Sequence, residues 1–170
     1  MNWLDVLIAL IIFIPAFFGF INGFLRKLFG LAGIVAGFIL AVKFFNPAGT
    51  FVIDKFHTSS TITLVIVFTV ILCVVYFLFI YIAKYMANLH PAVNIVNKLL
   101  GVALGFLQGI LISSILLFNL SYLNYPSLET RNTSILYGRL INIAPAFFDK
   151  VISFFPGSKS IYEEYKKLNE

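Results

Sequence analysis

One stretch decides the fold most clearly: residues 61–83 read TITLVIVFTVILCVVYFLFIYIA. The stretch carries no charge and is rich in Val, Ile, Leu and Phe. A helix of about 20 apolar residues is long enough to cross the hydrocarbon core of a bilayer. Toward its end lie Tyr76, Tyr81 and Tyr85 together with Lys84, which is the aromatic and basic pattern typical of a membrane interface. The stretch therefore predicts a transmembrane helix.

Three further apolar runs have similar lengths, at about residues 4–21, 28–45 and 99–120. The whole chain of 170 residues is 61% hydrophobic and only 11% charged. A soluble domain is near half apolar and a quarter charged, so there is too little charge here for a water-facing surface. We therefore expect an all-α integral membrane bundle of four transmembrane helices, with the lipid bilayer as its main partner.

The first two runs predict an antiparallel hairpin. No Lys or Arg precedes residues 4–21 and no small-residue cleavage site follows them, so we interpret this run as a retained anchor bent at Pro15. A short polar turn at residues 22–27 leads into the second run. The hairpin would bring Asp5 and Lys43 to the same membrane side. They could form an ion pair, or each could reach its own interface.

The connections and the fourth run offer few reactive groups. His57 lies in the expected loop 46–60 and His90 in the expected loop 84–98, both without a carboxylate or cysteine at metal-ligand spacing. Cys73 is the only cysteine, so it cannot form an internal disulfide. We predict no metal and no cofactor. The polar members of the fourth run include Gln108, Ser113 and Ser114, which we expect to face other helices.

Residues 126–170 differ from the four-helix domain at 1–125. Within 135–155, one predicted helix face carries Ala146, Phe147, Val151, Ile152, Phe154 and Phe155. Asp149, Lys150 and Ser153 lie opposite, and Pro145 suits the first turn of a helix. This predicts a C-terminal amphipathic helix lying in the interface or against the bundle, followed by a charged tail.

Basic residues mark the ends of the spans. Arg26, Lys27, Lys84 and Lys98 fall on one side, and Lys43, Lys55, Arg131 and Arg139 fall on the other. The balance is even, and the basic pair that follows the first helix favours both termini outside. The net charge of +5 is spread around apolar runs instead of forming one basic surface, so we predict no nucleic-acid binding.

Glycines recur at spacings of four. The sets are Gly19 and Gly23, then Gly33 and Gly37, and then Gly101, Gly105 and Gly109. Small residues four apart let two membrane helices approach closely. These faces predict either tight packing inside one monomer or a homodimer contact.

Two segments carry a family resemblance. The first is Trp3-Leu4-Asp5-Val6 followed by the run GFINGFLRKLFGLAG at residues 19–33. The second is NKLLG at residues 97–101, continued by Gly105 and Gly109. Together they resemble the colicin V production protein (CvpA) family over about residues 1–155. Asn97 stands where that family often has an acidic residue, and Gln108 where it often has a basic one.

The resemblance implies a bacterial cytoplasmic (inner) membrane protein connected with production or export of a peptide toxin and with envelope homeostasis. From the residues themselves, no catalytic motif is present, so we predict that the chain is not an enzyme. Two functions stay open. The chain is either a non-catalytic membrane component that assembles with itself or with an export partner, or a small oligomeric transporter or channel whose polar path includes Gln108, Ser113 and Ser114.

Overall fold

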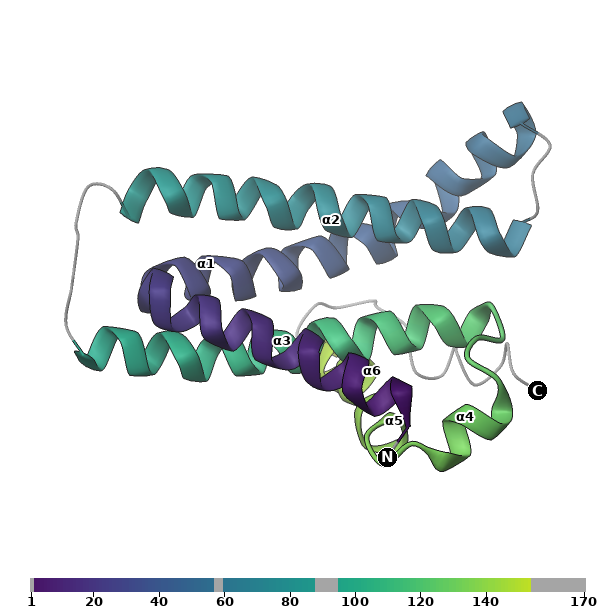
Figure 1. The fold of residues 1–170 in the computed structure, drawn as a ribbon. Helices are drawn as coiled ribbons and strands as arrows, with labels where there is room; N and C mark the ends of the chain where they lie inside the picture. The colour runs from purple at the N-terminus through teal and green to yellow at the C-terminus, as the bar shows by residue number, and fades with distance from the viewer. Residues whose placement is uncertain (1, 57–59, 88–94, 154–170) are drawn as a thin grey trace.

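The structure is a computed structural model that describes residues 2–56, 60–87 and 95–153. Those residues form helices and connections, without a strand (Figure 1). The helices are α1 (Trp3–Phe56), α2 (Ser60–Ala87), α3 (Ile95–Tyr122), α4 (Leu128–Thr133), α5 (Tyr137–Leu140) and α6 (Ile143–Ser153). Three of them contain a segment long and apolar enough to cross a membrane: Trp3–Phe45, Ile62–Tyr85 and Ile95–Tyr122.

Helix α1 is broken at Gly23, whose φ of 75° and ψ of −179° are not helical. We call residues 3–22 the first limb and residues 24–56 the second limb. Along the first limb, Gly19 meets Gly101 whereas Ile12 meets Gly109, so this limb runs antiparallel to α3. The second limb runs the other way, because Gly30 contacts Gln108 and later residues contact later parts of α3. The chain therefore reverses at Gly23, as the predicted hairpin requires (Figure 1).

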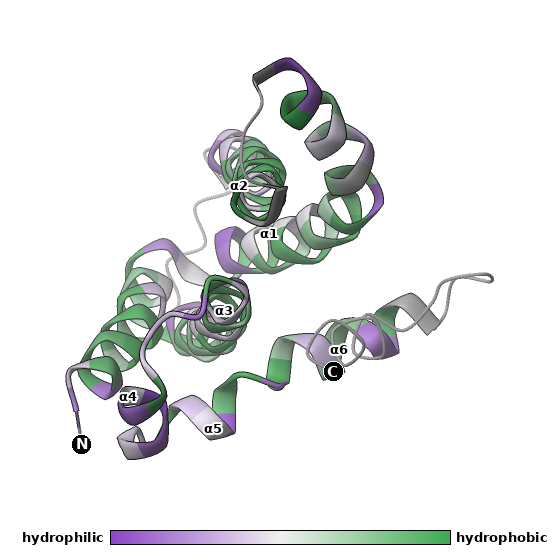
Figure 2. Cartoon of the chain, turned by 90° about the vertical axis from the view of Figure 1, so that its right-hand side faces the viewer, coloured by the Kyte–Doolittle hydropathy of each residue, from purple (hydrophilic) through white to green (hydrophobic). Residues whose placement is uncertain are grey.

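Helix α2 packs along the second limb in the antiparallel direction. Gly33 lies against Phe79, and Gly37 lies against Leu72, so both glycines sit where the two helices are closest. Helix α2 touches α3 very little, because the second limb lies between them over most of their length (Figure 2). All three long helices are apolar around most of their circumference (Figure 2).

The helices extend further than the apolar runs predict. Residues 46–56, expected in a loop, continue α1 despite Pro47. Proline removes one backbone donor and bends a helix without ending it when the following residues keep their own bonds. Here Thr50 Oγ1 donates to the Pro47 carbonyl at 3.1 Å, and the last turns leave at an angle (Figure 1). Residues 84–87 and 95–98, also expected in a loop, are helical.

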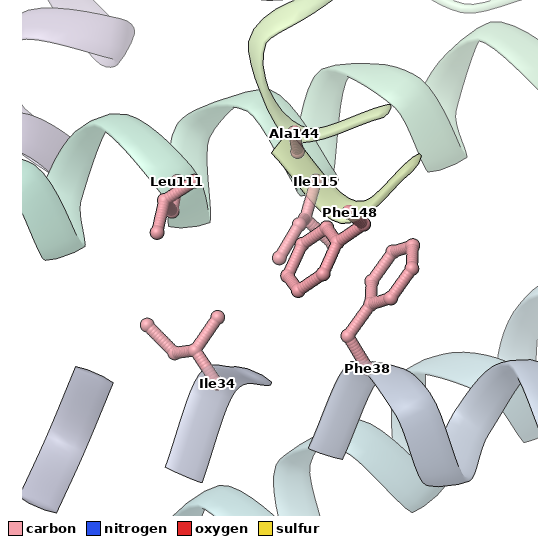
Figure 3. Close-up of a cluster of buried hydrophobic side chains, with 6 residues drawn as sticks. All are labelled: Ile34, Phe38, Leu111, Ile115, Ala144 and Phe148. Atoms are coloured by element: carbon pink, nitrogen blue, oxygen red, sulfur yellow. The ribbon is translucent and has the colours of Figure 1, made fainter. Parts of the chain in front are cut away.

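The segment after α3 returns to the bundle and completes its core. A cluster of buried apolar side chains joins the second limb, α3 and α6, and consists of Ile34, Phe38, Leu111, Ile115, Ala144 and Phe148 (Figure 3). Within residues 135–155, where one amphipathic helix is predicted, the structure has two short helices, α5 and α6, and the buried side of α6 differs from the predicted one. Ala144 and Phe148, four residues apart, face inward, whereas Ala146 is exposed. Phe154, Phe155 and the charged tail lie outside the described residues.

A second cluster joins the first limb to α3 and α5. It contains Leu4, Ile8, Ile12, Leu117, Tyr137 and Leu140. Both limbs of α1 therefore pack on α3, each through its own cluster. Residues on the two sides of the predicted boundary at 125 share these cores.

The outward surface is strongly apolar. On α2, a stripe with helical spacing is more than half exposed: Ile66, Val70, Val74, Phe77 and Tyr81. Such a continuous apolar surface is unusual on a water-soluble monomer. It is the surface that a lipid-facing helix requires.

Candidate functional site

The glycine faces are occupied within this one chain. A Cβ atom added at Gly109 would lie 2.6 Å from the Ile12 Cα, and one at Gly105 would collide with the Pro15 carbonyl. Gly19 and Gly101 meet backbone to backbone. Of the two alternatives for these faces, the structure has packing inside the monomer. A homodimer contact through this face of α3 would require the first limb to leave it.

The break at Gly23 is held by α3. The Phe24 amide donates to Asn97 Oδ1 at 3.0 Å, which satisfies one of the donors that a new helix start leaves without an intrahelical partner. A Cβ on Gly23 would collide with the Asn97 side chain, and its positive φ favours glycine. On the same stretch, Arg26 Nη1 donates to Asn22 Oδ1 at 2.8 Å. The Arg26 Nε is buried and has no hydrogen-bond partner in the described part of the chain.

The basic residues predicted at the interface do not behave alike. Lys84 is exposed. The Lys98 ammonium lies 5.2 Å from the centre of the Phe20 ring, which is within the range of a cation–π contact. Lys27 instead turns into the bundle and is only 7% exposed. The interface was its predicted place, and the structure encloses its side chain among the helices.

Lys27 begins a buried chain of polar groups that crosses three helices. Its Nζ donates to Gln108 Oε1 on α3 at 3.2 Å. Gln108 Nε2 donates in turn to the Tyr76 hydroxyl on α2 at 2.7 Å. Gln108 is fully buried, and Gly30 makes room for it, because a Cβ there would lie 3.0 Å from Gln108 Nε2. We call Lys27, Gln108 and Tyr76 the polar chain.

Ser113 and Ser114, the two serines of the predicted polar path, lie apart from the polar chain. Ser114 Oγ accepts from the Ala144 amide at 2.8 Å and lies 3.3 Å from the Ile141 carbonyl, so it fastens the start of α6 to α3. Ser113 is buried, and its hydroxyl has no hydrogen-bond partner among the described residues. Among the described residues, neither serine forms a hydrogen bond with the polar chain. The predicted path is therefore divided between two regions of α3.

Asp5 is buried and binds the segment between α4 and α5. Its Oδ1 accepts from Ser134 Oγ at 2.7 Å and from the Leu136 amide at 3.0 Å, while Oδ2 accepts from the Asn2 amide at 2.9 Å. Asn2 Nδ2 donates to the Thr130 carbonyl at 2.8 Å. We call these five residues the N-terminal clasp.

Of the two alternatives for Asp5 and Lys43, the ion pair is not formed in the described structure. The oxygens of Asp5 already accept three hydrogen bonds, which removes the need for a cation. The Lys43 ammonium lies 5.6 Å from the centre of the Phe44 ring. Asp5 is thus a structural acceptor for a distant part of the chain.

Two signals in the sequence could have located the polar chain. Lys27 lies three and seven residues before Gly30 and Ile34, so helical spacing puts it on the buried stripe of the second limb. Gln108 lies between Gly105 and Gly109 on the face of α3 that packs. Because the predicted turn at residues 22–27 included Lys27, its place on the buried stripe and its closeness to Gln108 were not predicted. No local signal marks the N-terminal clasp, because its partners are about 130 residues apart.

The described residues hold no group of three or more His, Cys, Asp or Glu side chains that could bind a metal ion. Cys73 is a partly buried free thiol. His57 and His90 lie outside the described residues. What the described core offers is a buried cation with amide and phenol partners, an arrangement suited to packing helices or binding a polar group.

Comparison with known proteins gives one family. A family model described as colicin V production protein matches residues 4–145. That match includes both limbs of α1, helices α2 to α5, and the first turn of α6. No curated protein and no solved structure is matched. Since the family model covers most of the chain, this protein belongs to the colicin V production protein family.

Proposed function

We propose that this protein is a non-catalytic component of the bacterial cytoplasmic membrane that takes part in the production or export of a peptide toxin. The apolar stripe of α2 carries the membrane part of the proposal, because side chains such as Phe77 and Tyr81 are 65% and 73% exposed. The toxin part rests on family membership. A role in envelope homeostasis belongs to the same proposal.

We further propose four membrane crossings. The first and second limbs of α1 run in opposite directions, and each is predominantly apolar. Helices α2 and α3 would supply the other two crossings. In this arrangement the break at Gly23 lies at the cytoplasmic side, together with Arg26, Lys84 and Lys98, and both chain ends lie outside.

Assembly is a better account of the described polar groups than catalysis. Ser114, Asn97 and Asp5 each hold one helix or turn against another. An enzyme would need titratable groups converging on one substrate position. The occupied glycine faces leave the outer side of α2 for contact with a second copy or with an export partner.

A transporter or channel is the second candidate, and the polar chain is the observation that favours it. Gln108 is near the middle of α3, and Tyr76 is near the middle of α2. Ionisable and polar groups at such depth often mark a transport route. If the chain conducts, Gln108→Leu abolishes solute flux into liposomes while the variant still inserts. Unchanged flux in that variant removes this route.

The proposed function is tested by deleting the gene and measuring small secreted peptides inside and outside the cells, with a complemented strain as the reference. Peptides retained inside the deletion strain support an export role. A complementing copy that carries Gly105→Leu serves as a control, because it tests whether the packed bundle itself is needed. Unchanged peptide pools in the deletion strain contradict the toxin role, and altered envelope sensitivity alone would then support a structural one.

A further inference from the structure

We infer that the polar chain is a binding site for an oxyanion, either the phosphate of an anionic lipid headgroup or a free phosphate. The inference begins from the burial of Lys27. Its side chain is 7% exposed and contacts one neutral acceptor, Gln108 Oε1, at 3.2 Å. A buried ammonium costs several kcal/mol unless an anion or several acceptors compensate it. One amide oxygen at the long end of the hydrogen-bond range compensates it only in part.

The hydrogen-bond capacity of the polar chain is unbalanced. Lys27 carries three N–H donors and Gln108 carries two, and each residue uses one in a recorded bond. Tyr76 accepts from Gln108, so its own O–H remains a donor. The only side-chain amide oxygen in the polar chain, that of Gln108, is already used. Within the described residues, the spare capacity is therefore made of donors, and an acceptor is the matching ligand.

The charge balance points the same way. The carboxylate of Asp5, at the start of α1, is in the N-terminal clasp with Ser134 and Leu136. It is therefore committed to neutral donors and does not reach Lys27. An acceptor that carries negative charge would complete the polar chain, and lysine binds phosphate as a point charge.

Tyr76 is the most exposed member of the polar chain. Gln108 is fully buried, whereas Tyr76 is only partly buried and lies on α2, the helix with the most exposed apolar surface. The Tyr76 end is therefore the least enclosed part of the polar chain. Tyr76 would bind the same oxyanion through its free O–H.

The test compares wild-type protein with Lys27→Met and Lys43→Met. Methionine keeps the length of lysine and removes its charge, and Lys43 is a matched control on the same limb. Each purified protein is titrated in detergent with phosphatidylglycerol, with phosphatidylcholine, and with sodium phosphate against sodium chloride at equal ionic strength. Binding is measured by native mass spectrometry and by the shift in melting temperature.

We expect phosphatidylglycerol or phosphate to bind wild type and Lys43→Met equally, and to bind Lys27→Met about 10- to 100-fold more weakly, the loss of one charge-assisted bond. Stabilisation by phosphatidylglycerol alone identifies a lipid headgroup, and stabilisation by phosphate alone identifies a free oxyanion. Equal binding in wild type and Lys27→Met overturns the inference. So does a wild type that neither ligand stabilises.

Tyr76→Phe keeps the test decisive if Lys27→Met does not fold. It removes one hydroxyl from a partly exposed position and leaves Lys27 in place. We expect binding of the same oxyanion to weaken by about 3- to 10-fold, as for one neutral hydrogen bond. Tyr81→Phe, on the exposed stripe, is the control. If Tyr76→Phe binds the oxyanion as tightly as Tyr81→Phe does, the role assigned to the Tyr76 hydroxyl is overturned.

Discussion

The rings of Phe38 and Phe148 stack in parallel, with centroids 3.5 Å apart and an interplanar angle of 5° (Figure 3). Phe38 belongs to the second limb and Phe148 to α6, so this contact fixes the C-terminal segment on the membrane bundle. Phe148 is completely buried, and its ring also meets that of Phe147 edge-on. The contact makes α6 part of the core, and its removal has a definite cost.

Phe148→Ala is therefore expected to destabilise the protein by about 3 kcal/mol, because it leaves a cavity lined by Phe38 and Ile115. Thermal unfolding in detergent measures the loss, and limited proteolysis after α3 reports whether α6 has detached. Ala146→Ser, at an exposed position of the same helix, is the control. An unfolding curve of Phe148→Ala that coincides with that of the control contradicts the assigned role.

Gly105→Leu should separate the first limb from α3, because any side chain at this position meets the backbone of Pro15 and Ala16. We expect a large drop in melting temperature. Gly138→Leu is the matched control, since nothing lies within 4 Å of a Cβ there. Equal melting temperatures in the two variants would show that the close backbone contact is not required.

Gly23→Ala should cost about 1–3 kcal/mol, because positive φ with extended ψ is a conformation almost limited to glycine, with a further cost from collision with Asn97. The double variant Gly23→Ala/Asn97→Ala should recover only the part of the unfolding free energy that the collision costs. The cost of the backbone conformation at residue 23 remains. A double-mutant cycle in chemical unfolding separates the two parts. Full recovery in the double variant contradicts the assignment of strain to the backbone at residue 23.

Asp5→Ala leaves the partly buried Leu136 amide and the Ser134 hydroxyl without their acceptor, and we expect a loss of about 1–3 kcal/mol. The exposed Asp54→Ala is the control. Because Asp5 binds neutral donors, exchanging charges in Asp5→Lys/Lys43→Asp should not restore stability. Restoration by that exchange would revive the ion pair and contradict the N-terminal clasp.

The main helices are predictable from sequence because burial in lipid requires long uninterrupted apolar runs, as in residues 61–83. The glycine spacing is similarly direct, since Gly101 and Gly105 can serve only close backbone contacts. The hairpin follows from the short turn after residue 21. Each of these features depends on a pattern within one continuous segment, so it can be recognised from the sequence alone.

The candidate site depends on which residues meet across segments, and this is where prediction fails. Residues 22–27 taken alone predict that Lys27 lies in a turn. In the structure its side chain lies inside the bundle and donates a hydrogen bond to Gln108. Asp5 offers no local sign of Ser134, which is 129 residues away. In α6, a difference of two positions decides whether Ala144 or Ala146 faces the core, and only the position of the second limb resolves it.

The N-terminal clasp has a consequence for how the protein is made. Asn2 and Asp5 are synthesised more than a hundred residues before their partners, residues 130–136. The first limb therefore has no α3 to pack against, and no clasp to close, until residues 95–136 have been translated. Closing the N-terminal clasp joins two segments that are more than a hundred residues apart, so a nascent chain interrupted before residue 134 leaves the Asp5 carboxylate without the Ser134 hydroxyl and the Leu136 amide.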